Sequence, residues 1–224
     1  MRCGTWNVGT LSEKSLELVD VFRNRRVDII CIQETKWKGQ KAKEIGGYKL
    51  WYSGNERRRN GVGIMISEKY VKDVVEVMRF GDRLMMVTLV VGVDPLVVIY
   101  AYAPHVGLGD SEKKEFWDKL DMVVNNILRE QNVFIGRDFN GHVGVEVDGY
   151  HRIHGGSGFG VKNESGKELL DFAMAHDLMV VNTFFKKKDD HLITFRSGDV
   201  LHKLITFLYT NEIEVGVQTA RYSR

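Results

Sequence analysis

Hydrophobic residues in this chain fall mostly in short runs that are rich in Val, Ile, Tyr and Phe and end in Gly, Asn or Asp. Runs of this length and composition are typical of β-strands bounded by turns. We predict strands at residues 2–8, 27–33, 48–53, 61–66, 73–79, 83–91, 96–102, 132–137, 178–182, 192–196 and 203–209.

Three longer segments place apolar residues at helical spacing. The first is predicted to begin at Ser12, with Ser15 as a competing N-cap, and to run to about Arg25. Ser111 is the expected N-cap of the second helix, and the third helix is predicted at about 164–176. Strands therefore outnumber helices, and the two kinds of element are interleaved along the chain.

The order of these elements predicts an α/β (α+β) fold with mixed sheets flanked by helices. Very short turns separate the strands within residues 73–102, which favours antiparallel pairing there. No linker, repeat or low-complexity stretch interrupts the 224 residues, so we expect a single domain over 1–224. The hydrophobic content of 43% and charged content of 28% are ordinary for a soluble globular protein.

Compartment and partners are constrained by what the sequence lacks. It has no apolar run of about 18 residues and no secretory leader pattern. We therefore expect an intracellular protein, nuclear or cytoplasmic, without membrane contact. Cys3 and Cys31 sit in strand-like stretches and are interpreted as reduced core thiols. With a net charge of only +2, contact with nucleic acid would depend on local basic patches.

Polar residues that end apolar runs are the candidates for chemistry. Asn7, Glu34, Tyr102 and the pair Asp138 and Asn140 all occupy such positions. Each alone is more often a turn residue or helix cap, but several together at strand ends indicate a site, because sites in open α/β sheets form there.

These residue types suit metal-assisted phosphoryl transfer. Mg²⁺ prefers oxygen ligands, so Glu34 is the best ligand candidate and Asn7 is a second residue on the metal side. Asp138, positioned by Asn140, is a candidate for orienting an attacking water. The Tyr102 hydroxyl is a candidate donor to a phosphate oxygen.

The stretches TWNV, QETK, YAP, GRDFNG and TFRSG occur in this order along the chain. Together they resemble the endonuclease/exonuclease/phosphatase family. Within it, the chain resembles in particular the endonuclease domains of non-LTR (LINE-type) retrotransposons and craniofacial development protein 2-like proteins. The resemblance covers nearly the whole chain.

The resemblance implies a DNase-like four-layer sandwich of two mixed β-sheets with helices outside. It also implies an Mg²⁺-dependent phosphodiesterase, with Mn²⁺ as an alternative, that acts as a monomer on duplex DNA. It assigns Asn7 and Glu34 to the metal side and Tyr102 to the phosphate. Asp138 and Asn140 become the pair that orients water or the leaving group.

Two family positions are not matched. Thr206 stands where the family has an Asp in a late strand, and no residue after it reproduces the family's His. We therefore expect weakened or absent activity and a domain that is truncated at its C-terminal strand. The alternative is a non-catalytic, decayed domain that folds and at most binds metal or nucleic acid. A branch acting on phosphoinositides or small phosphate esters is a weaker third interpretation.

The basic cluster formed by Arg57, Arg58 and Arg59 has two interpretations. A solvated loop is the default, because charged runs usually face water. Contact with the DNA backbone is the alternative, because phosphates reward clustered cations.

Overall fold

The computed structural model describes residues 1–12, 14–55, 60–104, 107–127, 130–138, 141–158, 160–186, 195–197, 200–202 and 205–210. Within these ranges it describes the backbone, but not the side chains, of 137–138, 195–197, 200–202 and 205–207. The elements in chain order are β1 (Cys3–Asn7), α1 (Ser15–Asn24), β2 (Ile29–Gln33), β3 (Gly39–Ile45), β4 (Tyr48–Gly54), β5 (Val62–Ser67), α2 (Glu68–Val71), β6 (Val74–Arg79), β7 (Leu84–Val91), β8 (Asp94–Tyr102), α3 (Asp110–Asn125), β9 (Asn132–Asp138), α4 (Glu164–Ala175), β10 (Leu178–Val180), the 3₁₀ helix η1 (Val181–Thr183), β11 (Phe195–Ser197), β12 (Val200–His202) and β13 (Ile205–Thr210).

The chain divides into two compact units. The first comprises Met1–Tyr102 and Arg129–Arg137, and the second comprises Ala103–Leu128 and Asp138–Arg224. Strands form a five-stranded sheet of order β1-β2-β5-β4-β3, a six-stranded sheet of order β10-β13-β9-β8-β7-β6, and a small β11-β12 pair. The prediction of an α/β fold built on two mixed sheets with helices is confirmed.

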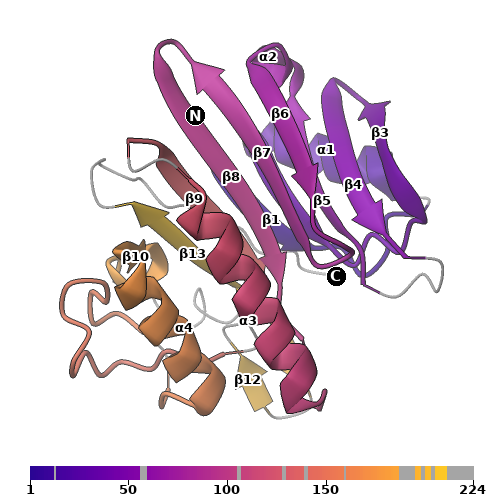
Figure 1. Ribbon diagram of the computed structural model, residues 1–224. Helices are drawn as coiled ribbons and strands as arrows, with labels where there is room; N and C mark the ends of the chain where they lie inside the picture. The colour runs from indigo at the N-terminus through magenta and orange to yellow at the C-terminus, as the bar shows by residue number, and fades with distance from the viewer. Residues whose placement is uncertain are drawn as a thin grey trace. The chain divides into compact units, whose positions relative to one another are not determined.

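The five-stranded sheet belongs to the first unit and has β3 at one edge (Figure 1). β1 and β2 are parallel, whereas the β2–β5, β5–β4 and β4–β3 pairs are antiparallel. β2 is fully buried, and its residues alternate between two cores because successive side chains of a strand point to opposite faces. Ile30 and Ile32 join α1 residues Val19 and Phe22 in the core on the helix side.

The opposite face of β2 and β5 contacts the second sheet within the same unit. β5 contacts β7 and β8, and β2 contacts β8. The β6–β7 and β7–β8 pairs are antiparallel, as the short turns predicted. On this face Cys31 approaches β9 so closely that a Cβ atom on Gly136 would lie 2.8 Å from the Cys31 Sγ atom. Gly136 is therefore required by close packing.

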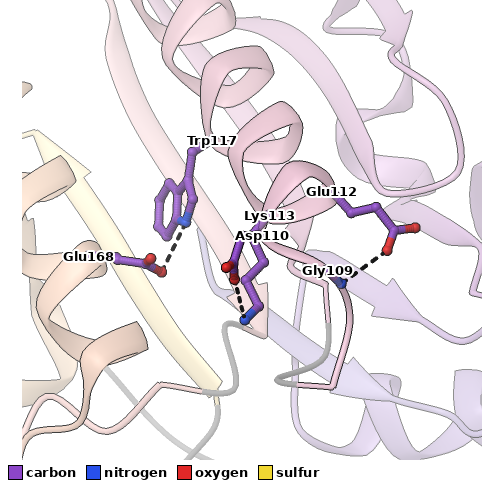
Figure 2. A network of polar contacts seen from close by, with 6 residues as sticks. All are labelled: Gly109, Asp110, Glu112, Lys113, Trp117 and Glu168. Atoms are coloured by element: carbon purple, nitrogen blue, oxygen red, sulfur yellow. Dashed lines mark hydrogen bonds and ion pairs between the residues drawn. The ribbon is translucent and has the colours of Figure 1, made fainter.

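The second unit contains a pair of interacting helices, α3 and α4. The indole N–H of Trp117 on α3 donates to the Glu168 carboxylate on α4 over 3.2 Å (Figure 2). At the start of α3, the Gly109 N–H donates to the Glu112 carboxylate over 3.3 Å (Figure 2). Gly109 is the N-cap, so the prediction of Ser111 was wrong by two residues. A Glu three residues after the cap identifies this start better than the serine does.

The structure corrects several further details of the predicted elements. α1 begins at Ser15 behind the N-cap Lys14, so Ser12 is not its start. β10 is only three residues long and passes directly into η1. β3 and α2 were not predicted, because β3 has the composition of a loop and α2 has only four residues. Among the described residues, no helix is long and apolar enough to cross a membrane.

The thiols are expected to be unreactive in the folded protein. Both cysteines are free, as predicted, and Cys31 is fully buried. Part of the Cys3 residue is exposed, but its thiol is enclosed, and burial raises its pKa to about 12. Burial also raises the pKa of the Cys31 thiol. At about pH 8 a free thiol is partly ionised, whereas these two stay protonated and poor nucleophiles.

Titration with a chromogenic disulfide reagent at that pH measures this directly. We expect slow release of chromophore from native protein and rapid reaction of both thiols in guanidinium chloride. Rapid reaction of the native protein would contradict the enclosed positions.

Candidate functional site

The candidate site lies at the ends of β1 and β2 in the first unit. The two strands are parallel, and their register places Asn7 beside Gln33, so the chain leaves both strands at the same edge of the sheet. Gln33 is fully buried, and the Tyr100 hydroxyl on β8 donates to its side-chain oxygen. This hydrogen bond fixes the last residue of β2 immediately before Glu34.

Glu34 has a left-handed backbone conformation, with φ +58°. This region is unfavourable for a residue with a Cβ atom and persists only when the surroundings impose it. Here the backbone N–H of Thr35 donates to the Gly61 carbonyl over 3.2 Å, and that of Lys36 donates to the Asn60 carbonyl over 3.3 Å. The turn after β2 is thus held by the segment that leads into β5.

The Glu34 carboxylate is half-buried and is oriented by two neighbours. Its Oε1 atom accepts a hydrogen bond from Asn7 Nδ2 over 2.8 Å and a longer one from the Tyr102 hydroxyl over 3.5 Å. The Asn7 Oδ1 atom accepts from the Gly9 N–H over 2.9 Å, which fixes the direction of the amide. Three residues that the sequence singled out are therefore brought together.

Arg83 adds a cation beside this cluster and was not singled out from the sequence. Its guanidinium group lies 5.4 Å from the centroid of the Tyr102 ring, and it donates to the Tyr102 carbonyl over 3.4 Å. The Tyr102 N–H donates in return to the Arg83 carbonyl over 2.8 Å. Tyr102 is 2% exposed, and this cation lies over its ring.

Asp82 is a second residue that the sequence did not reveal. Its carboxylate accepts from Asn55 Nδ2 over 2.6 Å and from Asn60 Nδ2 over 3.0 Å. Both ends of the β4–β5 connection are thereby tied to the start of β7. Because the Asn60 carbonyl accepts from Lys36, this carboxylate supports the turn that carries Glu34.

The donor set around Glu34 fits a hard cation. Among the described residues, Glu34 Oε2 has no hydrogen-bond partner, and no group of three His, Cys, Asp or Glu residues could hold a metal ion. Mg²⁺ is commonly held by one or two carboxylates together with water and substrate phosphate, so a single half-buried carboxylate is a fitting ligand for it. A zinc site would need more nitrogen or sulfur donors.

The other predicted residues are placed only in part. Asp138 is the last residue of β9, and Thr206 follows the first residue of β13; only the backbone of each is described. Asn140 lies outside the described residues, as do Arg57, Arg58 and Arg59.

Two mixed sheets with helices and a carboxylate at the strand ends indicate a DNase-like fold, the fold of a class of nucleases and phosphatases. The chain belongs to the Endonuclease/Exonuclease/phosphatase family, whose sequence pattern it matches over residues 4–141.

Relatives and solved structures agree with this membership. Craniofacial development protein 2 from Bos taurus is 30% identical over 199 residues, covering 88% of this chain and 33% of the relative. The chain thus spans about a third of the length of the curated relatives it matches.

Two solved structures show the shared fold. The endonuclease domain of TRAS1, a telomere-specific non-LTR retrotransposon, is 12% identical with a TM-score of 0.63, covering 93% of this chain and 84% of that domain. The 3'-5' exonuclease NExo from Neisseria meningitidis is 16% identical with a TM-score of 0.70, covering 94% and 87%.

Replacing Asp82 tests whether it supports the turn. We expect Asp82→Ala to lower the free energy of unfolding by about 1–3 kcal/mol, because two partly buried amides lose their acceptor. Chemical denaturation followed by circular dichroism measures this. Asp94→Ala, which removes an exposed carboxylate at the first residue of β8 in the same unit, is the matched control and should change stability little. Equal stabilities of the two variants would contradict the role of Asp82.

Proposed function

We propose that this chain is an Mg²⁺-dependent phosphodiesterase of endonuclease type that acts on DNA and derives from a retrotransposon. The observation that carries the proposal is the contact of Asn7 and Tyr102 with the Glu34 carboxylate, in a chain that belongs to this family. Mn²⁺ is the alternative ion, because it also prefers oxygen ligands.

In this proposal Glu34 holds the metal, and Asn7 belongs to the metal side of the site. With the amide direction described above, Asn7 orients the carboxylate through its Nδ2 group. When bound, the metal would neutralise charge on the phosphate. Tyr102 would donate its hydroxyl to a phosphate oxygen, and the nearby guanidinium group of Arg83 would favour an anionic substrate.

Two further roles rest on motif positions. Asp138 and Asn140 would form the pair that orients the attacking water or the leaving group. Support comes from their place in the GRDFNG stretch, with Asp138 ending a sheet strand. Arg57, Arg58 and Arg59 would contact the DNA backbone from the connection between β4 and β5.

The names of the structural neighbours favour DNA as the substrate. They include AP endonucleases from Leishmania major and Archaeoglobus fulgidus, and the 3' phosphatase NExo bound to a product DNA hairpin. Retrotransposon origin is supported by the motif wording of that branch and by the likeness to the TRAS1 endonuclease domain.

The Thr at position 206 indicates that the enzyme would be weakened. It also supports the second candidate function, a domain that folds and at most binds metal or nucleic acid without turnover. Thr carries no charge at neutral pH, so it cannot orient or stabilise a protonated His as the family's Asp would. Disabling an Asp–His unit commonly costs about 10⁴-fold in rate. We therefore expect activity well below that of a relative that has both residues.

A supercoiled-plasmid nicking assay separates the two candidates. We expect slow nicking in Mg²⁺ that disappears with a chelator and in Glu34→Gln, because the Gln side chain keeps the shape but loses the charge that holds the metal. Thr206→Asp alone should change the rate little, because no residue reproduces the His that this Asp would orient, and a gain would identify Thr206 as the lesion.

Glu76→Gln is the matched control, because it neutralises an exposed carboxylate on β6 in the same unit and should leave nicking unchanged. Circular dichroism verifies that every variant is folded. If neither the folded wild type nor folded Thr206→Asp nicks DNA, the enzyme proposal is rejected and the non-catalytic domain is favoured.

A further inference from the structure

The segment that leads into the edge strand β3 and runs along it carries an unusual concentration of positive charge. Between Glu34 and Glu44 the chain has four lysines (Lys36, Lys38, Lys41 and Lys43) and no acidic residue. The whole chain has a net charge of only +2, so this segment is a local excess of cations. It begins two residues after the carboxylate that we propose as the metal ligand.

The strand register places two of these lysines on one face of the sheet. Lys41 pairs with Tyr52 and Lys43 pairs with Leu50, and both partners belong to the core that α1 covers. Lys41 and Lys43 therefore lie on the same side of β3. β3 is an edge strand of its sheet (Figure 1). Both are exposed, as is Lys36.

An aromatic ring lies within this row of cations. The Lys43 ammonium group is 5.2 Å from the centroid of the Trp37 ring. Trp37 in turn packs edge-to-face on Tyr52, with ring centroids 5.1 Å apart. The ring is thus anchored to the sheet and holds the Lys43 side chain against the surface.

Within the described part of the chain, three of these lysines have no acidic partner. None of Lys36, Lys41 and Lys43 forms an ion pair there, whereas Lys114, Lys119 and other exposed lysines do. Exposed ammonium groups repel each other at low salt, so their concentration in one short segment is unfavourable unless a polyanion neutralises it.

We propose that Lys36, Lys41 and Lys43, with Trp37, form a lysine edge that binds the phosphate backbone of DNA outside the candidate site. The inference rests on the proposed function for the identity of the partner. The lysine edge would bind the part of a duplex that extends from Glu34 along β3. Its contribution to the affinity would not depend on the DNA sequence, because ammonium groups contact phosphates and not bases.

Edge protection is the competing explanation. Lysines on an edge strand prevent the strand from pairing with another chain, and this requires charge but not a particular sign. Replacing Lys41 and Lys43 by Glu keeps the edge charged and reverses the interaction with phosphate. This pair of substitutions therefore distinguishes DNA binding from edge protection.

The test is the fluorescence anisotropy of a labelled DNA duplex to which the protein is added. The buffer contains a chelator, and the titration is repeated at several salt concentrations. Each phosphate contact contributes about 0.9 to the slope of log K against log salt, so Lys41→Ala/Lys43→Ala should reduce the slope by about 1.8. Lys41→Glu/Lys43→Glu should bind more weakly than the Ala pair.

Lys69→Ala/Lys72→Ala is the matched control. It removes the same charge from exposed positions at α2 in the same unit, and Lys69 also packs on an aromatic ring, that of Tyr70. This pair should keep the wild-type slope.

The proposal of a lysine edge would be overturned if folded, monodisperse Lys41→Glu/Lys43→Glu bound the duplex with the affinity and salt slope of the wild type. It would also be overturned if the wild type did not bind the duplex. Because the chelator prevents metal-dependent cleavage, this result is separate from the nicking assay. Absence of nicking with a normal lysine effect would reject the enzyme proposal alone.

Discussion

The buried hydrogen bond from Tyr100 to Gln33 is the interaction on which the candidate site depends. It joins β2 to β8 at the last residue before Glu34, in the middle of the first unit. Ile30 and Ile32 hold the same strand on the α1 side, and Cys31 lies against Gly136 on the other. β2 therefore cannot shift without breaking a buried hydrogen bond, which costs about 0.5–1.5 kcal/mol, or opening a packed core.

A fixed strand end allows the next residue to take a conformation that the chain would otherwise avoid. The left-handed backbone at Glu34 costs on the order of 1–3 kcal/mol. Backbone hydrogen bonds from Thr35 and Lys36 to the β4–β5 connection offset that cost, and Asp82 holds the connection in place. The carboxylate is thus oriented by rigid strands before any ligand arrives, which is what electrostatic stabilisation of a substrate requires.

Sequence reasoning found the elements whose pattern is local. Buried strands such as β2 and β8 could be predicted because they are nearly continuous apolar runs, and α4 could be predicted from the helical spacing of its apolar residues. β3 was missed because Lys, Gln, Ala and Gly replace the β-branched residues, and only its pairing with β4 makes it a strand. Asp82 was missed because its partners are distant in sequence. Asn7, Glu34 and Tyr102 were singled out because each ends an apolar run, whereas their mutual contacts became visible only in the structure.

A nearly neutral chain can bind a polyanion only if its positive charges are clustered on part of the surface. Screening at physiological salt limits the reach of an exposed charge to about 8 Å, so the overall charge matters less than the local one. The Glu34 carboxylate alone would repel a phosphate, whereas Arg83, which lies over the Tyr102 ring, and the lysine edge would attract it. A bound divalent cation would remove the remaining repulsion at Glu34. In the proposed function, the binding of metal and of DNA would therefore favour each other, because each would reduce the electrostatic cost of the other.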